Sequence, residues 1–317
     1  MVHRPEPSVP PPPPSDGDGS LACGAGAVGA VLLGDDCWCL TGPTAAGKSA
    51  VAVRLADRLG AEIVSADSMA VYAGLDIGTA KPTAAERALV PHHLIDVVPA
   101  SAPFNVALWL DAARSAITAI RARGRQVLVC GGTPLYLKAL AEGLDPLPAA
   151  DATLRARLES EADALGSASL HDRLALIAPH AAARIHPADR RRVVRALEIV
   201  AGGGSVGGGW RHPRSPVWHG RFLVVDRPRR LLGERIDRRV DRMFAAGLVD
   251  EVRRVDAADG LGPTARQAAG YAECLDFLAG RCTLADAVAR TKRRTRQLAK
   301  RQLTWLRSFR EAVWISG

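Results

Sequence analysis

The sequence predicts an α/β fold in which helices cover both faces of a parallel β-sheet. In the first half of the chain, short apolar runs alternate with amphipathic stretches, which is the pattern of successive βα units. Residues 151–201 instead contain three helical patterns with no strand between them, and a strand pattern returns only at 219–226. We therefore expect a core formed by residues 35–145 and 216–317, with residues 146–215 inserted as an all-helical subdomain.

Each element has its own signal along the chain. Residues 1–34, which include an unbroken proline run, are expected to be a disordered tail because this composition cannot bury a core. Strands are expected at 37–41, 63–66, 94–98 and 126–130, with helices at 50–59 and 105–123. Helices then follow at 151–165, 169–178 and 189–201, a flexible Gly-rich linker at 202–209, a strand at 219–226, a long amphipathic helix at 283–309 and a last strand at 312–315.

The composition narrows the class of protein. The 317 residues are 48% apolar and 24% charged, no apolar run approaches the ~20 residues of a membrane span, and the N-terminus lacks a signal-peptide pattern. The six cysteines show no C-x-x-C spacing, and His92 and His93 would point to opposite sides of a strand. We therefore expect a cytoplasmic protein with no membrane contact, no disulfide framework and no zinc site. We also expect a monomer.

The most specific motif is a phosphate-binding loop between the first expected strand and the first expected helix. Its glycines let backbone N–H groups turn toward phosphate oxygens, its lysine adds positive charge, its serine can hold Mg²⁺, and the following helix presents its positive end. This context predicts a P-loop NTPase-like fold, and the loop alone would suggest a nucleotide-binding, ATP-binding protein. The loop residues are Gly42, Pro43, Thr44, Ala45, Ala46, Gly47, Lys48 and Ser49.

Polar residues lie within this loop and at the ends of neighbouring strands. Asp67 follows the second expected strand, where it could accept a proton from a nucleophile or bind Mg²⁺ through water, although capping of a turn would also explain it. Thr44 could donate to a phosphate oxygen or to the local backbone. The fourth expected strand ends in Gly131, Gly132 and Thr133 rather than an acid, which argues against a motor-type ATPase and leaves the backbone open to close approach by a substrate.

Positive charge is concentrated near the C-terminus. The net charge is +9, and the ten Lys/Arg and one Asp between Arg281 and Arg310 account for all of it. Such a basic helix indicates a polyanionic partner, with a solvated charged face as the alternative. Four arginines within residues 190–195 favour phosphate contacts, whereas the arginines along 235–242 alternate with aspartates and fit either helix ion pairs or a lid over a second phosphate group.

These motifs, in this order, resemble the bacterial type of tRNA dimethylallyltransferase, a family also called the tRNA isopentenyltransferases or IPP transferases. The resemblance covers residues 38–315 and is carried by nine segments, each of which is moderately specific alone. They read GPTAAGKS, DSMAVY, DIGTAKP, PHHLIDV, GGTPLYLKALAEGL, RIHPADRRRVVRALEI, GLVDEV, ARQAAGYAE and TRQLAKRQLTWLR.

The resemblance implies a reaction with two substrates. A dimethylallyl group passes from dimethylallyl diphosphate to the exocyclic amine of the adenosine 3′ of the anticodon, in tRNAs reading codons that begin with U, and diphosphate is released. The base is flipped out of the anticodon stem-loop to be reached. In this family reading Asp67 is the catalytic base, Thr44 bonds near the bridging oxygen, the P-loop with Arg235 and Arg239 binds the diphosphate, and Ser49 holds the Mg²⁺ cofactor.

The resemblance also implies a set of tRNA contacts. The inserted helices would grip the anticodon stem, and the basic last helix would line the phosphate backbone. There are three alternatives: an adenylate isopentenyltransferase, a P-loop metabolite kinase and a non-enzymatic RNA chaperone. The Arg-rich insert and the basic helix favour a tRNA substrate over those of the two alternative enzymes. Asp67 favours an enzyme over the chaperone. The carried-over tRNA-contacting residues are Asp67, Ser68, Met69, Ala70, Thr133, Arg155, Arg191, Arg192, Val193, Val194, Arg195, Gln267, Ala268, Ala269, Gly270, Tyr271 and Ala272.

Overall fold

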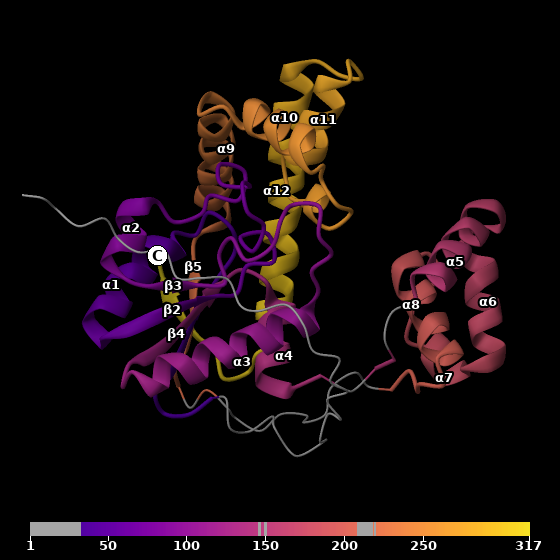
Figure 1. The fold of residues 1–317 in the computed structure, drawn as a ribbon, viewed down its shortest axis with the longest axis horizontal. Helices are drawn as coiled ribbons and strands as arrows, with labels where there is room; N and C mark the ends of the chain where they lie inside the picture. The colour runs from indigo at the N-terminus through magenta and orange to yellow at the C-terminus, as the bar shows by residue number, and fades with distance from the viewer. Residues whose placement is uncertain (1–32, 145–146, 149–150, 208–217, 219) are drawn as a thin grey trace, which may run out of the picture.

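A six-stranded sheet with the order β3-β2-β4-β1-β5-β6 lies within the larger part of the molecule, and every strand pair in it is parallel (Figure 1). The computed structural model describes residues 33–144, 147–148, 151–207, 218 and 220–317, so the expected N-terminal tail lies almost wholly outside the described residues. The strands are β1 (Cys37–Thr41), β2 (Ala61–Ser65), β3 (His92–His93), β4 (Gln126–Gly131), β5 (Phe222–Asp226) and β6 (Val313–Ser316). The predicted fold class is therefore confirmed.

The two faces of the sheet are covered by different helices because successive side chains of a strand point to opposite sides. Leu128 of β4 lies in one apolar cluster with α1 (Lys48–Leu59). Its neighbours Val127 and Val129 lie in another cluster with α3 (Val106–Ala122). Burial on both faces explains why β4 reads as a continuous apolar run, and it leaves the carboxyl ends of the strands as the place for polar loops.

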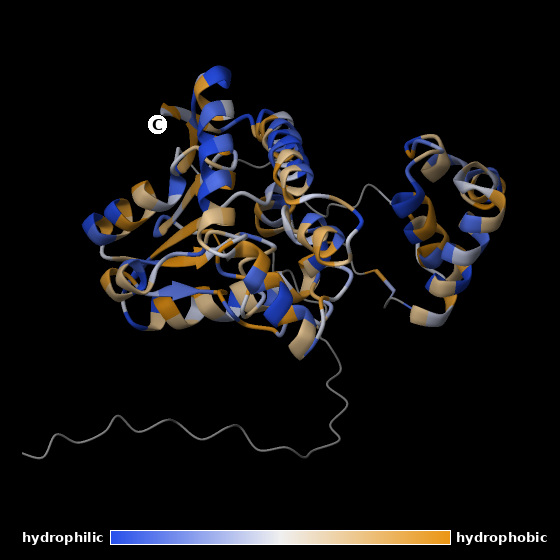
Figure 2. Ribbon diagram, turned by 90° about the horizontal axis from the view of Figure 1, so that it is seen from above, coloured by the Kyte–Doolittle hydropathy of each residue, from blue (hydrophilic) through white to orange (hydrophobic). Residues whose placement is uncertain are grey.

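The remaining helices fall into two groups in space. Helices α5 to α8 enclose their own apolar cluster, which includes Leu158, Leu174 and Val193, and Figure 1 shows this group set apart from the sheet. Bands of hydrophobic and hydrophilic residues alternate along these helices (Figure 2). The bounds are α2 (Ala84–Leu89), α4 (Pro134–Glu142), α5 (Ala152–Leu165), α6 (Ser167–Ile177), α7 (Pro179–Ala182), α8 (Arg190–Ala201), α9 (Arg229–Ala245), α10 (Leu248–Ala258), α11 (Tyr271–Leu278) and α12 (Leu284–Leu306).

The third expected strand is wrong in position. β3 pairs with β2 through His92 and His93 alone, whereas the strand was expected at 94–98. Leu94 and Asp96 have φ angles of 62° and 58°, which are incompatible with a strand. The backbone N–H of Asp96 instead donates to the carbonyl oxygen of Ala70. This segment therefore pairs with the turn after β2 and does not extend the edge strand of the sheet.

The long helix α12 crosses the carboxyl edge of the sheet beside α9. Thr283 and Asp286 form a capping box at its start, which fixes where the helix begins. Leu232 and Ile236 of α9 pack against Ala299 of α12 and against the P-loop residue Ala45, so the two basic helices are held over the phosphate-binding loop by apolar contacts. No helix in the part of the chain that the structure describes is both long and apolar enough to cross a bilayer.

Candidate active site

A cavity of about 430 Å³ opens at the carboxyl ends of β2 and β4, between the P-loop and α12. Segments that are far apart in the sequence meet there, and the loops after β1, β2 and β4 do so because parallel strands end at the same edge of the sheet. The predicted site residues that line it are Thr44, Lys48, Ser49, Asp67, Ser68, Met69, Ala70, Thr133, Arg239, Gln267, Ala268 and Ala269.

The P-loop has the tight backbone that its glycines allow. Gly42 has a φ of +147°, and a Cβ atom there would lie 2.3 Å from the carbonyl oxygen of Val225. Gly47 has a φ of +104° and precedes the first residue of α1, Lys48, whose Nζ donates to the carbonyl oxygen of Pro43 at 2.8 Å. The loop therefore wraps around its own lysine at the positive end of a helix, which is the arrangement that binds phosphate groups.

Two half-buried cations of the cavity, Lys48 and Arg239, are partly withdrawn from water. Burial lowers the pKa of Lys48 to about 8, with repulsion from Arg239 acting in the same direction and the nearby Cys130 and Asp67 acting against it. Burial also lowers the pKa of Arg239, which the charge of Asp67 partly offsets. In the described part of the chain neither side chain forms an ion pair with a carboxylate. A bound anion would therefore stabilise both charges.

Arg235 binds the P-loop backbone and is not among the residues that line the cavity, although it was expected to bind diphosphate directly. Its Nε donates to the carbonyl oxygen of Ala45 at 2.8 Å. Arg227, which the sequence reasoning missed, makes the equivalent bond to the carbonyl oxygen of Ala46 at 2.8 Å. Its place directly after β5 was the available signal, because residues at strand ends in this fold face the ligand edge.

Gln302 is a second residue that the sequence reasoning missed. Its Oε1 accepts a hydrogen bond from the backbone N–H of Thr44 at 2.8 Å, and its Nε2 donates to the carbonyl oxygen of Gly132. The side chain is buried and joins the P-loop to the loop after β4. Gln302 is uncharged, and the functional prediction for this basic segment considered only its lysines and arginines.

We expect Gln302→Leu to lower the free energy of unfolding by about 2–3 kcal/mol, because the substitution leaves the N–H of Thr44 and the carbonyl of Gly132 without their partner. Chemical denaturation would measure the change. Gln297→Leu, on the exposed side of the same helix, is the matched control. Equal stability of the two variants would show that the bridge contributes nothing.

Asp67 takes part in the turn after β2 and also lines the cavity. Its Oδ1 accepts the backbone N–H of Met69 at 2.9 Å, so the capping interpretation describes one of its oxygens. Thr133 lies opposite and accepts the N–H of Ser68 at 3.0 Å through its Oγ1. The loops after β2 and β4 are therefore joined at the side of the cavity where Asp67 lies.

The glycines after β4 are explained by the protein's own packing. A Cβ atom on Gly131 would lie 2.2 Å from the backbone of Ala66, and one on Gly132 would lie 2.7 Å from Nε2 of Gln302 and 3.6 Å from Nζ of Lys48. Close packing against Ala66 and Gln302 therefore requires glycine at these two positions, whereas the sequence led us to expect that their open backbone would admit a substrate.

Burial argues against tRNA contact for three of the predicted side chains, and an ion pair within the protein engages two others. Val193 and Val194 are 0% and 2% exposed in the core of the helical group, and Tyr271 is 0% exposed, so the prediction of direct contact is wrong for these side chains. Arg155 and Arg195 both donate to the buried carboxylate of Glu198. The other predicted positions outside the cavity lining are Arg191 and Arg192, which are exposed on α8, and Gly270 and Ala272, at and after the start of α11.

The charge of α12 is partly neutralised by the core. Arg290, Lys292, Arg294 and Arg296 form ion pairs with carboxylates of α9 and α11. Arg301 forms no ion pair in the part of the chain that the structure describes, and it lines both the cavity and an adjoining basic groove. The helix therefore offers fewer available charges to a polyanion than its sequence indicates.

Comparisons with known proteins agree with this geometry. The family model described as IPP transferase matches residues 70–309, and the one described as isopentenyl transferase matches residues 36–93. A tRNA dimethylallyltransferase of Anaeromyxobacter sp. (strain Fw109-5) is 50% identical over 279 residues, which are 87% of this chain and 93% of the relative. One from Pelobacter propionicus is 46% identical over 281 residues, 87% and 91% of the two chains.

Two solved structures of tRNA-modifying transferases are also similar to this chain. The tRNA isopentenylpyrophosphate transferase of Bacillus halodurans is 42% identical with a TM-score of 0.63, covering 88% of this chain and 89% of that one. A eukaryotic dimethylallyltransferase acting on tRNA is 27% identical with a TM-score of 0.70, covering 88% and 73%.

Proposed function

The chain belongs to the IPP transferase family, and we propose that it transfers a dimethylallyl group from dimethylallyl diphosphate to the exocyclic amine of the adenosine 3′ of the anticodon in tRNA. The amine nitrogen attacks the first carbon of the isoprenoid. The carbon–oxygen bond breaks, its electron pair leaves with diphosphate, and Asp67 accepts the proton of the attacking nitrogen. We further propose that the substrates are tRNAs reading codons that begin with U, and that the protein acts as a monomer in the cytoplasm.

One observation carries this proposal: two half-buried cations and one carboxylate share a single cavity. Lys48 and Arg239 lie where a diphosphate would be held by the P-loop, and Asp67 lines the same cavity. Cations placed in advance stabilise the charge that develops on a departing diphosphate. The cavity also has apolar lining that suits an isoprenoid tail, including Met69, Met243 and Leu298.

Mg²⁺ fits the donors of this cavity. Ser49 and Asp67 supply oxygen atoms beside the P-loop, and Mg²⁺ is usually held by one or two protein oxygens together with substrate phosphates and water. We propose that Ser49 holds the ion and that Asp67 can contribute through water. When bound, the ion neutralises part of the diphosphate charge.

The tRNA is proposed to contact the cavity mouth and the helical group. Ser68, Met69, Ala70, Thr133 and residues 267–269 would surround the flipped adenine, because they line the cavity beside Asp67. The exposed Arg191 and Arg192 of α8 would contact the phosphates of the anticodon stem. This assignment retains the proposed division into a core, residues 35–145 and 216–317, and an inserted subdomain, residues 146–215.

The decisive test is a transfer assay with labelled dimethylallyl diphosphate. We expect label in a tRNA that reads a codon beginning with U, and none in the same tRNA with guanosine in place of the target adenosine. Preferential labelling of free AMP would identify an adenylate isopentenyltransferase instead. Transfer of the terminal phosphate of ATP would identify a kinase.

We expect Arg301→Gln to weaken tRNA binding and to reduce the slope of log Kd against log salt by about 1, because Arg301 is available to a phosphate. Binding measured over a range of salt concentrations tests this. Arg296→Gln is the matched control, since Arg296 is paired with Asp237, with Nη2 2.5 Å from Oδ2. The idea fails if the two variants have the same slope as the parent protein.

A further inference from the structure

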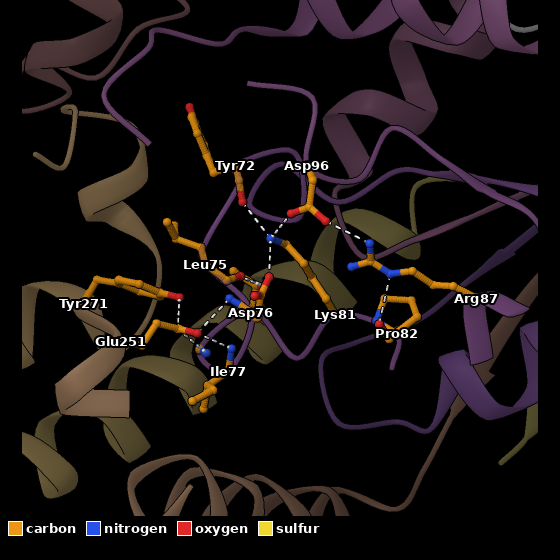
Figure 3. A network of polar contacts seen from close by, with 12 residues as sticks. Tyr72, Leu75, Asp76, Ile77, Lys81, Pro82, Arg87, Asp96, Glu251 and Tyr271 are labelled. Carbon is orange, nitrogen blue, oxygen red and sulfur yellow. Dashed lines mark hydrogen bonds and ion pairs between the residues drawn. The ribbon is translucent and has the colours of Figure 1, made fainter. Parts of the chain in front are cut away.

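The carboxylate of Glu251 is the centre of a buried hydrogen-bond network away from the phosphate-binding loop (Figure 3). Glu251 is 1% exposed on α10. Its Oε2 accepts the backbone N–H groups of Asp76 at 2.9 Å and Ile77 at 2.7 Å, and its Oε1 accepts that of Gly78 at 3.2 Å. The hydroxyl of Tyr271 donates to the same Oε1 at 2.6 Å. One charged group therefore holds three consecutive amides of a loop and the first residue of α11.

Both segments that Glu251 joins continue into the wall of the candidate active site. Gly78, which carries the last of the three amides, lines the cavity together with residues 79–82, and residues 267–269 line it just before Tyr271. The carbonyl oxygen of Thr79 accepts a hydrogen bond from Arg239 at 3.4 Å. A displacement of residues 76–79 would therefore move a hydrogen-bond partner of Arg239, one of the two cations of the cavity.

The packing around the network leaves little room for other arrangements. A Cβ atom on Gly78 would lie 2.4 Å from the ring of Tyr271 and 2.9 Å from Leu248. Burial and the neighbouring Glu251 carboxylate raise the pKa of Tyr271, so its hydroxyl stays protonated and donates.

At the other end of the loop, Lys81 donates to the carbonyl oxygen of Tyr72 at 2.7 Å and to Asp76 at 2.8 Å (Figure 3).

We propose that Glu251 is a positioning residue that fixes the 76–79 loop against α11 and thereby places Arg239 for the diphosphate. The role requires a carboxylate, because all four partners are donors and only an ionised carboxylate accepts on both oxygens. This inference rests on the proposed function only for the identity of the diphosphate substrate. Neither the motif GLVDEV nor DIGTAKP shows from sequence alone that its residues meet.

The test compares Glu251→Gln with the parent protein in two measurements that do not need turnover. Hydrogen exchange is expected to be faster at the amides of Asp76, Ile77 and Gly78 while those of β1 and β4 stay protected. Titration with inorganic diphosphate is expected to show about 10-fold weaker binding, since small misplacements of binding groups have effects of this order or greater. Unchanged loop exchange or unchanged diphosphate affinity would overturn the proposal.

Glu273→Gln provides the matched control. Glu273 is also a buried carboxylate, 4% exposed, and accepts the backbone N–H of Gly270 at 3.0 Å, but it does not touch the 76–79 loop. We expect normal exchange at residues 76–78 in this variant. Faster exchange there in both variants would show general loosening of the fold and would also overturn the proposal.

Kinetics separate positioning from loss of folded protein. In the transfer assay, Glu251→Gln is expected to raise KM for dimethylallyl diphosphate by about 10-fold with a smaller change in KM for tRNA. A fall in kcat alone, as from a smaller folded fraction, would contradict the positioning role. If the parent protein shows no transfer, the proposed function fails, while the exchange and diphosphate measurements still decide the role of Glu251.

Discussion

Asp67→Asn is expected to reduce kcat for dimethylallyl transfer by about 10²–10⁴-fold, the range that a positioned general base contributes. The amide is nearly the same size as the carboxylate, and its oxygen can still accept the N–H of Met69, so the turn after β2 should persist. What the variant loses is the capacity to take the proton of the attacking amine. Single-turnover transfer, with the protein in excess over labelled dimethylallyl diphosphate and with saturating tRNA, would measure the loss, and tRNA affinity should stay near the parent value.

Two comparisons make this expectation specific to the base role. Asp111→Asn removes an exposed carboxylate on α3, 72% exposed, and is expected to leave the rate unchanged. Removal of the Asp67 charge should also lower the pKa of Lys48 further, because Asp67 is one of the groups that raise it. If Asp67→Asn transfers the isoprenoid at the parent rate, another group accepts the proton.

The phosphate loop and Asp67 could be predicted from sequence because their signals are local. The glycine spacing of residues 42–49 specifies one backbone path, and a polar residue at the end of an apolar strand faces the ligand edge of a parallel sheet. The misplaced third strand shows the limit of local signals. Residues 94–98 have strand-like composition, yet the contact of Asp96 with the turn at Ala70 determines their backbone.

The residues that were missed act across long separations in the chain. Gln302 and Thr44 are 258 positions apart, and Glu251 and Ile77 are 174 apart. Each is a buried polar group whose partner is a backbone amide. Every residue except proline carries such an amide, so the sequence does not mark which one is the partner. Burial of a carboxylate is stable only with such partners, so the structure is needed to show them.

The prediction of tRNA contacts was wrong where every residue of a helical segment, 191–195, was expected to contact tRNA. Residues 191–195 form one turn and a half of α8, and a helix turns each side chain about 100° from the last. The two valines therefore face the core of the helical group while Arg191 and Arg192 face outward. Helical periodicity within the block would have separated these two sets.

Lys48→Met is expected to lower kcat/KM for dimethylallyl diphosphate by about 10²–10³-fold, comparable to removal of one preorganised donor from a site of developing negative charge. The methionine fills similar space without charge, so the cavity should keep its shape. The protein should not lose stability at pH 7, because burial disfavours the charged lysine in the folded state. Thermal unfolding of the variant checks this point independently of activity.

The pH dependence of binding provides the sharper test of Lys48. Its pKa of about 8 in the free protein lies below the ordinary value, and a bound diphosphate favours the protonated form and must raise it. Binding of inorganic diphosphate near pH 9 should therefore take up protons, and affinity should weaken as pH rises above 8. Calorimetry in buffers of different ionisation enthalpy measures that uptake. Loss of the uptake in Lys48→Met, with retention in Asp111→Asn, would assign it to Lys48, whereas the same uptake in both variants would place the titrating group elsewhere.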